Sequence, residues 1–334
     1  MTTLGKYRHL AQASTPAGHF VMLAIDHRDV LRDALNRTAP SPISDAQFAA
    51  FKRDVMQHLL PACSAVLADP GYGFGPGIAD GTIGGAIGVL APLEDASYTT
   101  DPHRYRPAFM PGWSVARIKR FGGAGVKLLV YYHPEASTAA AVRDTVSRAV
   151  EECARYDLPL YLEPLSFSPD PDRPLPSAER RQLGVEAART FCALGIDVLK
   201  AEFPVNVRQE PDEDIWRAAL AELDAACTVP WTLLSAGVDY PTFLRQTELA
   251  CQAGASGVIV GRSVWAEAAS LDGEARARFL ATTGQERLRA LAAACAQHGA
   301  DWRRRVAPPE TTAPDWYFGY GEFGDQYKLA EARR

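Results

Sequence analysis

Five charged side chains interrupt apolar runs of this sequence where buried strands are expected. They are Asp26, Lys127, Glu163, Lys200 and Glu202. A charge inside a buried strand is costly unless the group is paired or functional. Because side chains alternate along a strand, Lys200 and Glu202 share one face. The same holds for Tyr161 and Glu163. If these faces point inwards, two lysines and two or three carboxylates meet in one cavity.

This combination of residues suits Schiff-base chemistry on Lys200. A lysine attacks a ketone only as the free amine, which an apolar cavity and a neighbouring cation such as Lys127 favour. The iminium then withdraws electrons and permits cleavage of the carbon–carbon bond two positions away. A general acid/base must move the protons, and Glu163 and Asp26 are candidates. The alternative is a buried ion-pair network without a catalytic role.

The elements that must position these residues are short apolar runs separated by amphipathic stretches. Eight runs are expected as strands, at 20–26, 65–69, 86–93, 126–132, 160–167, 198–205, 231–236 and 257–260. Apolar residues recur every three or four positions over 45–60, 138–156, 179–194, 212–226 and 240–253, which predicts helices. Eight strand–connector units predict an α/β fold, a (β/α)₈ TIM barrel. An open doubly wound sheet is the rival, but no glycine-rich phosphate turn follows the first run.

Two segments differ from this alternation. The second connector, 71–85, is rich in glycine and hardly helical, so we expect an active-site loop there. After the eighth run, 273–303 predicts one or two helices. We expect 1–305 to form a single barrel domain with this C-terminal helical extension, and 306–334 to form an aromatic tail. Such an aromatic segment should dock on the barrel or on a partner subunit.

Small residues close the seventh and eighth runs. Ser235 and Gly237 follow the seventh run, and Gly261 and Arg262 follow the eighth. In a parallel barrel, the loops after these two strands commonly form a phosphate site. Small residues let main-chain N–H groups reach an anion, and an arginine adds a fork of donors. We therefore predict an anion site here, with two ordinary glycine turns as the alternative.

The bulk composition excludes several classes of protein. The chain has 334 residues, a net charge of −5 and one short basic run at 303–305, which argues against a nucleic-acid partner. No apolar run reaches the roughly 18 residues of a membrane span, and the first residues lack a signal-peptide pattern. Six cysteines without a CxxC pair predict a reduced, cytoplasmic protein without a structural zinc site. We expect no cofactor, no metal, a small sugar phosphate as ligand, and a homo-oligomer.

Seven segments together resemble the class I tagatose-1,6-bisphosphate aldolase family, with its sulfofructosephosphate aldolase relatives. They are LAIDHR (23–28), ADPGYG (68–73), GVKLLVYYHP (125–134), LYLEPLSF (160–167), DVLKAEFPV (197–205), LSAGVD (234–239) and AGASGVIVGRSVW (253–265). They occur in the family's order over about residues 18–305. The resemblance implies a metal-independent barrel aldolase.

The resemblance also implies roles for individual residues. Lys200 would be the Schiff-base lysine, Glu163 the acid/base, Lys127 the neighbouring cation and Asp26 the carboxylate of the first strand. The 1-phosphate of the dihydroxyacetone phosphate half would lie on the anion site, that is, on Ser235, Gly237, Gly261 and Arg262. We expect His27 and Arg28 to bind the far end of the ketose.

Some features depart from the family pattern. Tagatose-type members usually have Asp-Gln-Arg where this chain has Asp26-His27-Arg28. The Asp-His-Arg and Tyr-His-Pro triplets also resemble an aldolase that acts on 2-deoxy-5-keto-gluconate 6-phosphate. The segment 166–177 and the tail after Val306 do not match. The aldehyde product is therefore open between glyceraldehyde 3-phosphate, sulfolactaldehyde and malonic semialdehyde.

Two other functions compete with a Schiff-base aldolase. A zinc-dependent aldolase needs several histidines together, whereas only His27 and His133 follow strands, without HxH or HxxxH spacing. A chelator distinguishes this class. A non-catalytic sugar-phosphate sensor would not need to keep lysine, glutamate and aspartate together, and a turnover assay distinguishes it.

Overall fold

Eight parallel strands close into a barrel in sequence order, with β1 paired to both β2 and β8. The computed structural model describes residues 2–39, 41–96, 100–312 and 314–319. The strands are β1 Phe20–Ile25, β2 Ala65–Ala68, β3 Gly88–Pro92, β4 Gly125–Tyr132, β5 Leu160–Ser166, β6 Val198–Ala201, β7 Trp231–Leu234 and β8 Gly257–Val260. Each lies on one of the eight predicted runs, so the predicted barrel is confirmed.

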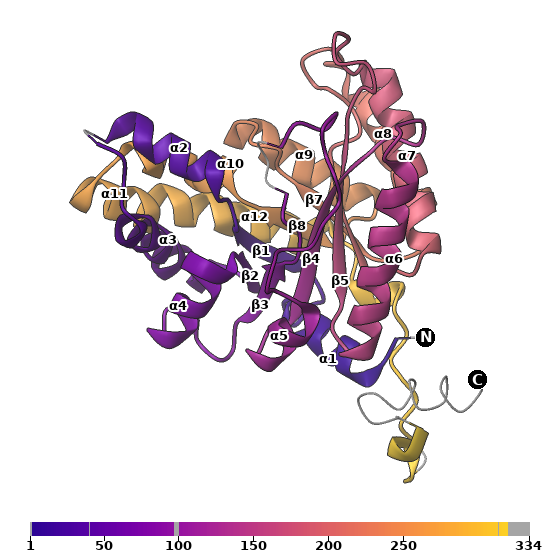
Figure 1. Ribbon diagram of the computed structural model, residues 1–334. Coiled ribbons are helices and arrows are strands. Elements are labelled where there is room, and N and C mark those ends of the chain that lie inside the picture. The colour runs from indigo at the N-terminus through magenta and orange to yellow at the C-terminus, as the bar shows by residue number, and fades with distance from the viewer. Residues whose placement is uncertain (1, 40, 97–99, 313, 320–334) are drawn as a thin grey trace.

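Helices surround the strands on all sides visible in Figure 1, with α1 beneath the barrel. They are α1 Leu4–Gln12, α2 Asp29–Thr38, α3 Asp45–Leu59, α4 Gly75–Ala79, α5 Val115–Arg120, α6 Ala139–Arg155, α7 Ser177–Ala193, α8 Glu213–Ala226, α9 Tyr240–Ala253, α10 Arg262–Trp265, α11 Gly273–Phe279 and α12 Gln285–His298. The five helices expected from apolar spacing correspond to α3, α6, α7, α8 and α9. The predicted C-terminal extension corresponds to α11 and α12, joined by a π-helical turn at Leu280–Gly284.

Local sequence explains where these helices begin. Ser44 and Gln47 form a capping box at the start of α3, which satisfies main-chain N–H groups that the helix leaves unpaired. Asp239 caps α9 by accepting from the N–H of Thr242, and Pro241 lies in its first turn. Both caps follow loops at the C-terminal end of the barrel. They therefore fix the points from which the chain returns along the outside.

The lower interior of the barrel is apolar. Phe20, Met22 and Tyr161 are fully buried and belong to one cluster inside the strands. Leu10 of α1 and Trp302 join this cluster, so α1 and the chain after α12 cover the N-terminal end of the barrel. Two residues further along β5 and β6, the buried inward-facing residues Glu163 and Lys200 are charged. The strand periodicity thus places the ionisable groups above an apolar floor, at the end where barrel chemistry is found.

The first part of the second connector is helical up to Ala79, although its glycines predicted a loop, whereas residues 80–85 are turns and bends. Pro70–Phe74 forms a π-helical turn that continues into α4. Asp69 accepts from the N–H of Tyr72, and Pro70 starts the turn, so cap and proline outweigh the poor helix propensity of glycine. Gly77 packs against Met56 and Ile83. The segment covers α3, and none of it lines the cavity described below.

The chain beyond the barrel is described only in part. Val306 is buried against the barrel floor, and Trp316–Gly319 forms a short 3₁₀ turn in which Tyr317 is exposed. The expected docking of the aromatic tail concerns mainly 320–334, which lie outside the described residues. Across the described ranges, no helix is long and apolar enough to cross a membrane. The same residues hold no group of three or more His, Cys, Asp or Glu side chains able to bind a metal ion.

Candidate active site

A cavity of about 240 Å³ opens at the C-terminal ends of the strands. Its walls come from β1, β4, β5, β6, β7 and β8 and from the residues that follow them. The lining residues are Ala24, His27, Tyr131, Glu163, Leu165, Ser166, Lys200, Glu202, Leu234, Ser235, Ala236, Ile259, Gly261 and Arg262. Polar groups therefore gather at one end of the barrel above aliphatic side chains, which is typical of a site for a small polar ligand.

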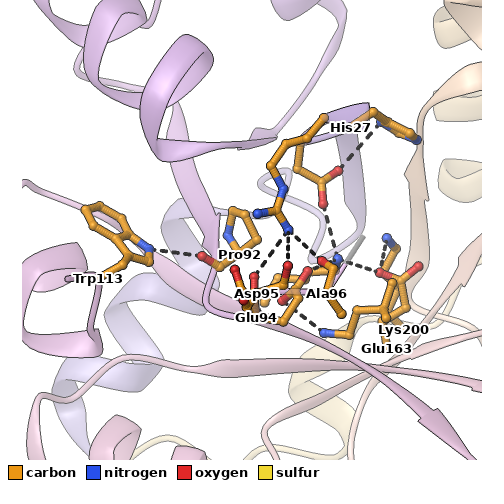
Figure 2. Close-up of polar contacts among 12 residues, drawn as sticks. His27, Pro92, Glu94, Asp95, Ala96, Trp113, Glu163 and Lys200 are labelled. Carbon is orange, nitrogen blue, oxygen red and sulfur yellow. Dashed lines mark hydrogen bonds and ion pairs between the residues drawn. The ribbon is translucent and has the colours of Figure 1, made fainter. Parts of the chain in front are cut away.

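Lys200 and Glu163 lie in contact on this wall. The parallel register pairs Tyr161 with Val198, so the next inward residues of the two strands face each other. The Lys200 Nζ donates to Glu163 Oε2 at 2.9 Å, and both side chains are almost fully buried. Figure 2 shows Glu163 and Lys200 side by side in the network of polar contacts. Glu202 also lines the cavity, as its shared face with Lys200 predicted.

Lys127 lies beneath this pair among three carboxylates. Its Nζ is 3.1 Å from Glu163 Oε2, 3.2 Å from Asp26 Oδ2 and 2.6 Å from Glu94 Oε1. Its side chain is 1% exposed, so the ammonium group has no access to bulk water. One cation thus links carboxylates from β1, β5 and the end of β3. It holds Glu163 in position below Lys200.

Burial and charge act on the three carboxyl groups to different extents. Burial alone would raise the pKa of each, because it disfavours the charged form. Burial is the largest single influence at Asp26 and Glu163, but the charges of Lys127 and Lys200 and their hydrogen bonds together outweigh it, so both pKa values are lowered. At Glu94, burial outweighs the attraction of Lys127, and the pKa is raised. Asp26 and Glu163 are therefore carboxylates at neutral pH.

Glu94 is a site residue that the sequence patterns did not identify. It directly follows the third apolar run, one residue beyond the stretch searched for buried charges. Its Oε2 accepts from the N–H of Leu129 at 3.1 Å, and its backbone bridges to Phe109. Extending the search by one residue past each run would have found it, since side chains at the C-terminal ends of barrel strands point into the same mouth.

His27 and Arg28, which are expected to bind the far end of the substrate, point in different directions after β1. His27 lines the cavity, packs edge-on against Trp265 and lies 3.8 Å from Asp26. Burial lowers the pKa of His27 to about 3 despite the nearby Asp26, so the ring is neutral at physiological pH. Arg28 does not line the cavity. Its guanidinium donates to the main-chain carbonyl oxygens of residues 94–96 and holds the loop after β3.

The expected anion site forms the wall next to His27, at the ends of β7 and β8. Ser235, Gly261 and Arg262 line the cavity, and the Arg262 guanidinium packs against Gly237. Ala236 and Gly237 both have positive φ, 48° and 75°. A non-glycine residue in this conformation stores strain of order 1 kcal/mol, and such strain gathers at ligand sites. At Gly261, a Cβ would lie 2.8 Å from the His27 ring, so only glycine fits.

A closed parallel barrel with a buried lysine–carboxylate pair at its mouth is the arrangement expected of a barrel aldolase. The comparisons with known proteins agree with this class. The model of the DeoC/LacD family of aldolases matches residues 20–267. The chain belongs to this family, and it is an aldolase, a lyase that acts on carbon–carbon bonds.

Curated relatives align over nearly their whole length. Tagatose 1,6-diphosphate aldolase 2 of Enterococcus faecalis is 32% identical over 333 positions, which cover 91% of this chain and 97% of the relative. Tagatose 1,6-diphosphate aldolase of Streptococcus agalactiae is 30% identical, and the alignment covers 90% of this chain and 98% of that relative. The family resemblance drawn from the sequence segments is thus confirmed.

Solved structures share the fold. A Schiff-base-forming fructose-1,6-bisphosphate aldolase superimposes with a TM-score of 0.58 at 19% identity, covering 87% of this chain and 99% of that one. Fructose-bisphosphate aldolase of Plasmodium falciparum superimposes with a TM-score of 0.65 at 11% identity, covering 87% and 94%. At these identities the likeness concerns the barrel alone.

Proposed function

We propose that this protein is a class I aldolase that reversibly cleaves a ketose 1-phosphate through a Schiff base on Lys200. The observation that carries the proposal is the buried Lys200 amine, 2.9 Å from Glu163, in the cavity that Arg262 also lines. The products are dihydroxyacetone phosphate and an aldehyde. No metal is required, because the iminium itself accepts the electrons of the breaking bond.

Lys200 and Glu163 can together carry out the chemical steps of the cleavage. The Lys200 amine attacks the C2 carbonyl, and the carbinolamine loses water to give the iminium. A base then removes the proton of the C4 hydroxyl, the C3–C4 bond breaks, and its electrons move into the iminium to form an enamine. Glu163 is proposed as this acid/base because its carboxylate contacts Lys200 and lines the cavity. Protonation of C3 and hydrolysis release dihydroxyacetone phosphate.

Lys127 and Asp26 support this exchange from below. Lys127 lies within 3.2 Å of both Glu163 and Asp26. We propose that it keeps Glu163 ionised and ready to take a proton, and that Asp26 balances the added positive charge. Because neither Asp26 nor Lys127 lines the cavity, both are positioning residues in this scheme.

The 1-phosphate is assigned to the wall formed after β7 and β8. Arg262 supplies charge-assisted donors there, while Ser235, Gly237 and Gly261 leave room for main-chain N–H groups. Tagatose 1,6-bisphosphate is the first candidate ketose, since relatives that share about 30% of residues are named for it. A 6-deoxy-6-sulfofructose 1-phosphate that yields sulfolactaldehyde is the second, because it presents the same first three carbons. The homo-oligomer and the cytoplasmic location stay predictions.

Borohydride trapping tests the proposal directly. Reduction in the presence of dihydroxyacetone phosphate should add one substrate mass to the peptide that carries Lys200. Lys200→Ala should abolish the label, whereas Lys119→Met, on α5 beside His9, should retain it. Cleavage of both candidate ketoses should survive prolonged EDTA. Full labelling of Lys200→Ala would refute the Schiff base, and loss of activity on chelation with recovery on adding zinc would refute the class.

A further inference from the structure

Glu202 is a cavity carboxylate to which the reaction scheme above gives no task. It follows β6 two residues after Lys200 and lines the same cavity. At about 3.3 Å per residue, its Cα lies roughly 6.6 Å further towards the mouth. A ketose joined to Lys200 through C2 extends its remaining carbons past Glu163. We therefore place Glu202 within range of C5, the second carbon beyond the cleaved C3–C4 bond.

Three hydrogen bonds fix this carboxylate. Glu202 Oε2 accepts from the main-chain N–H and from the hydroxyl of Ser166, both at 2.7 Å. Glu202 Oε1 accepts from Arg180 Nη1 at 2.9 Å. A carboxylate offers about four acceptor positions, two on each oxygen. The pair with Arg180 uses one position of Oε1 and leaves the other for a further donor.

Glu202 follows β6, the neighbour of β7, but its hydrogen bonds with Ser166 hold the carboxylate towards β5. Its partner Ser166 ends β5, whereas Arg262 follows β8. A ketose with its phosphate on the Arg262 side therefore directs its aldehyde half to the Ser166 side. Because Arg180 balances the charge of Glu202, the region does not strongly repel an anion one carbon further on. What it specifically offers is an acceptor for a hydroxyl.

From this we infer that Glu202, held by Ser166 and Arg180, recognises the ketose C5 hydroxyl and restricts the enzyme to 2-hydroxyaldehyde products. This inference rests on the proposed function. Glyceraldehyde 3-phosphate and sulfolactaldehyde both carry that hydroxyl, whereas malonic semialdehyde lacks it. The third candidate product is thereby disfavoured. In the complex with an analogue that lacks the hydroxyl, an acceptor position on Glu202 stays without its donor, and this penalises binding of that analogue.

Aldol addition in the reverse direction isolates this hydroxyl. Dihydroxyacetone phosphate is combined with 2-hydroxypropanal or with propanal, which differ only in the group concerned. The wild-type enzyme should prefer 2-hydroxypropanal by about 10- to 100-fold in kcat/KM, the range expected for a hydrogen bond to a charged acceptor. Glu202→Gln should reduce the preference to less than about threefold. The two donors of Ser166 would attract the amide oxygen, and the amide nitrogen would then replace Oε1 as a donor.

Two controls separate recognition from structural support. Glu222→Gln removes the bidentate pair with Arg181 between α7 and α8, outside the cavity, and should leave the preference unchanged. Glu202→Ala covers the case in which the glutamine variant folds poorly. Trapping of dihydroxyacetone phosphate on Lys200 reports whether each variant keeps a working first half of the site.

The outcomes are distinct. A lost preference with trapping retained supports the inference. If trapping persists but both aldehydes slow equally, so that the ratio stays at its wild-type value, Glu202 is only structural and the inference fails. A wild-type enzyme that does not prefer 2-hydroxypropanal also overturns it. Absence of trapping in the wild type would instead refute the proposed function.

Discussion

Replacing Lys127 with methionine removes the cation that three buried carboxylates share. Methionine has nearly the same length and needs no charged partner. Glu163 would keep its 2.9 Å contact with Lys200, but Asp26 and Glu94 would each lose the cation nearest to them. Removing one partner of a buried ion pair typically costs about 3–5 kcal/mol, because the other charge stays buried and unpaired. We therefore expect Lys127→Met to lose roughly 3–5 kcal/mol of unfolding free energy at pH 7.5.

The loss should shrink on acidification, because an unpaired buried carboxylate can take a proton instead. For Asp26, whose unfolded pKa is about 3.9, protonation costs about 5 kcal/mol at pH 7.5 but only about 2 kcal/mol at pH 5.5. In the variant, the folded pKa of Asp26 lies above the unfolded value, so stability rises as pH falls. In the wild type, Asp26 has a lowered pKa, and its contribution is lost only below about pH 4. Glu94, whose pKa is already raised in the wild type, should contribute less than Asp26 to this pH dependence.

Urea unfolding at pH 7.5 and pH 5.5 measures both effects. Lys52→Met is the matched control, since Lys52 is equally buried but pairs with one carboxylate, Asp69, outside the cavity. That control should lose stability yet still trap dihydroxyacetone phosphate, whereas Lys127→Met should trap it slowly. The double variant Lys127→Met/Asp26→Asn should recover much of the lost stability. A loss below about 1 kcal/mol at pH 7.5, or one independent of pH, would refute the assignment of Lys127 as the shared counter-ion.

Three further predictions follow from the same geometry. Glu163→Gln should still form the Schiff base but cleave the ketose about 10²–10⁴-fold more slowly, and a loss under threefold in steady-state kinetics would assign the proton transfer elsewhere. Arg262→Ala should weaken inhibition by dihydroxyacetone phosphate about 10- to 100-fold, and unchanged inhibition would move the phosphate from β8. His27 has a folded pKa of about 3, well below its unfolded value near 6.5, so the wild type should lose about 2 kcal/mol of stability between pH 6.5 and pH 5 as the unfolded chain takes the proton. In urea unfolding His27→Gln should lack this dependence, and an identical pH slope in both proteins would contradict the neutral, buried ring.

Several features followed from the sequence alone because they depend on local periodicity. Apolar runs separated by helical spacing determined eight strands and the closed barrel, since a strand buried on both faces must be apolar along its length. The same rule made Lys127, Glu163 and Lys200 conspicuous, because a charge in such a strand requires a partner. Alternation along β6 was enough to place Glu202 on the face of Lys200.

Other features were decided only when the chain closed on itself. Glu94 joins Lys127 because β3 lies next to β4 in the barrel, a contact between residues that no local pattern connects. The sequence does not determine the direction of the Arg28 side chain. In the fold, the carbonyl oxygens of the loop after β3 bind its guanidinium away from the cavity. The glycines of the second connector suggested a loop, but a cap and packing on α3 made residues 70–79 helical. Spacing along the chain thus shows which residues need partners, whereas the identity of each partner depends on which strands and loops the closed barrel makes neighbours.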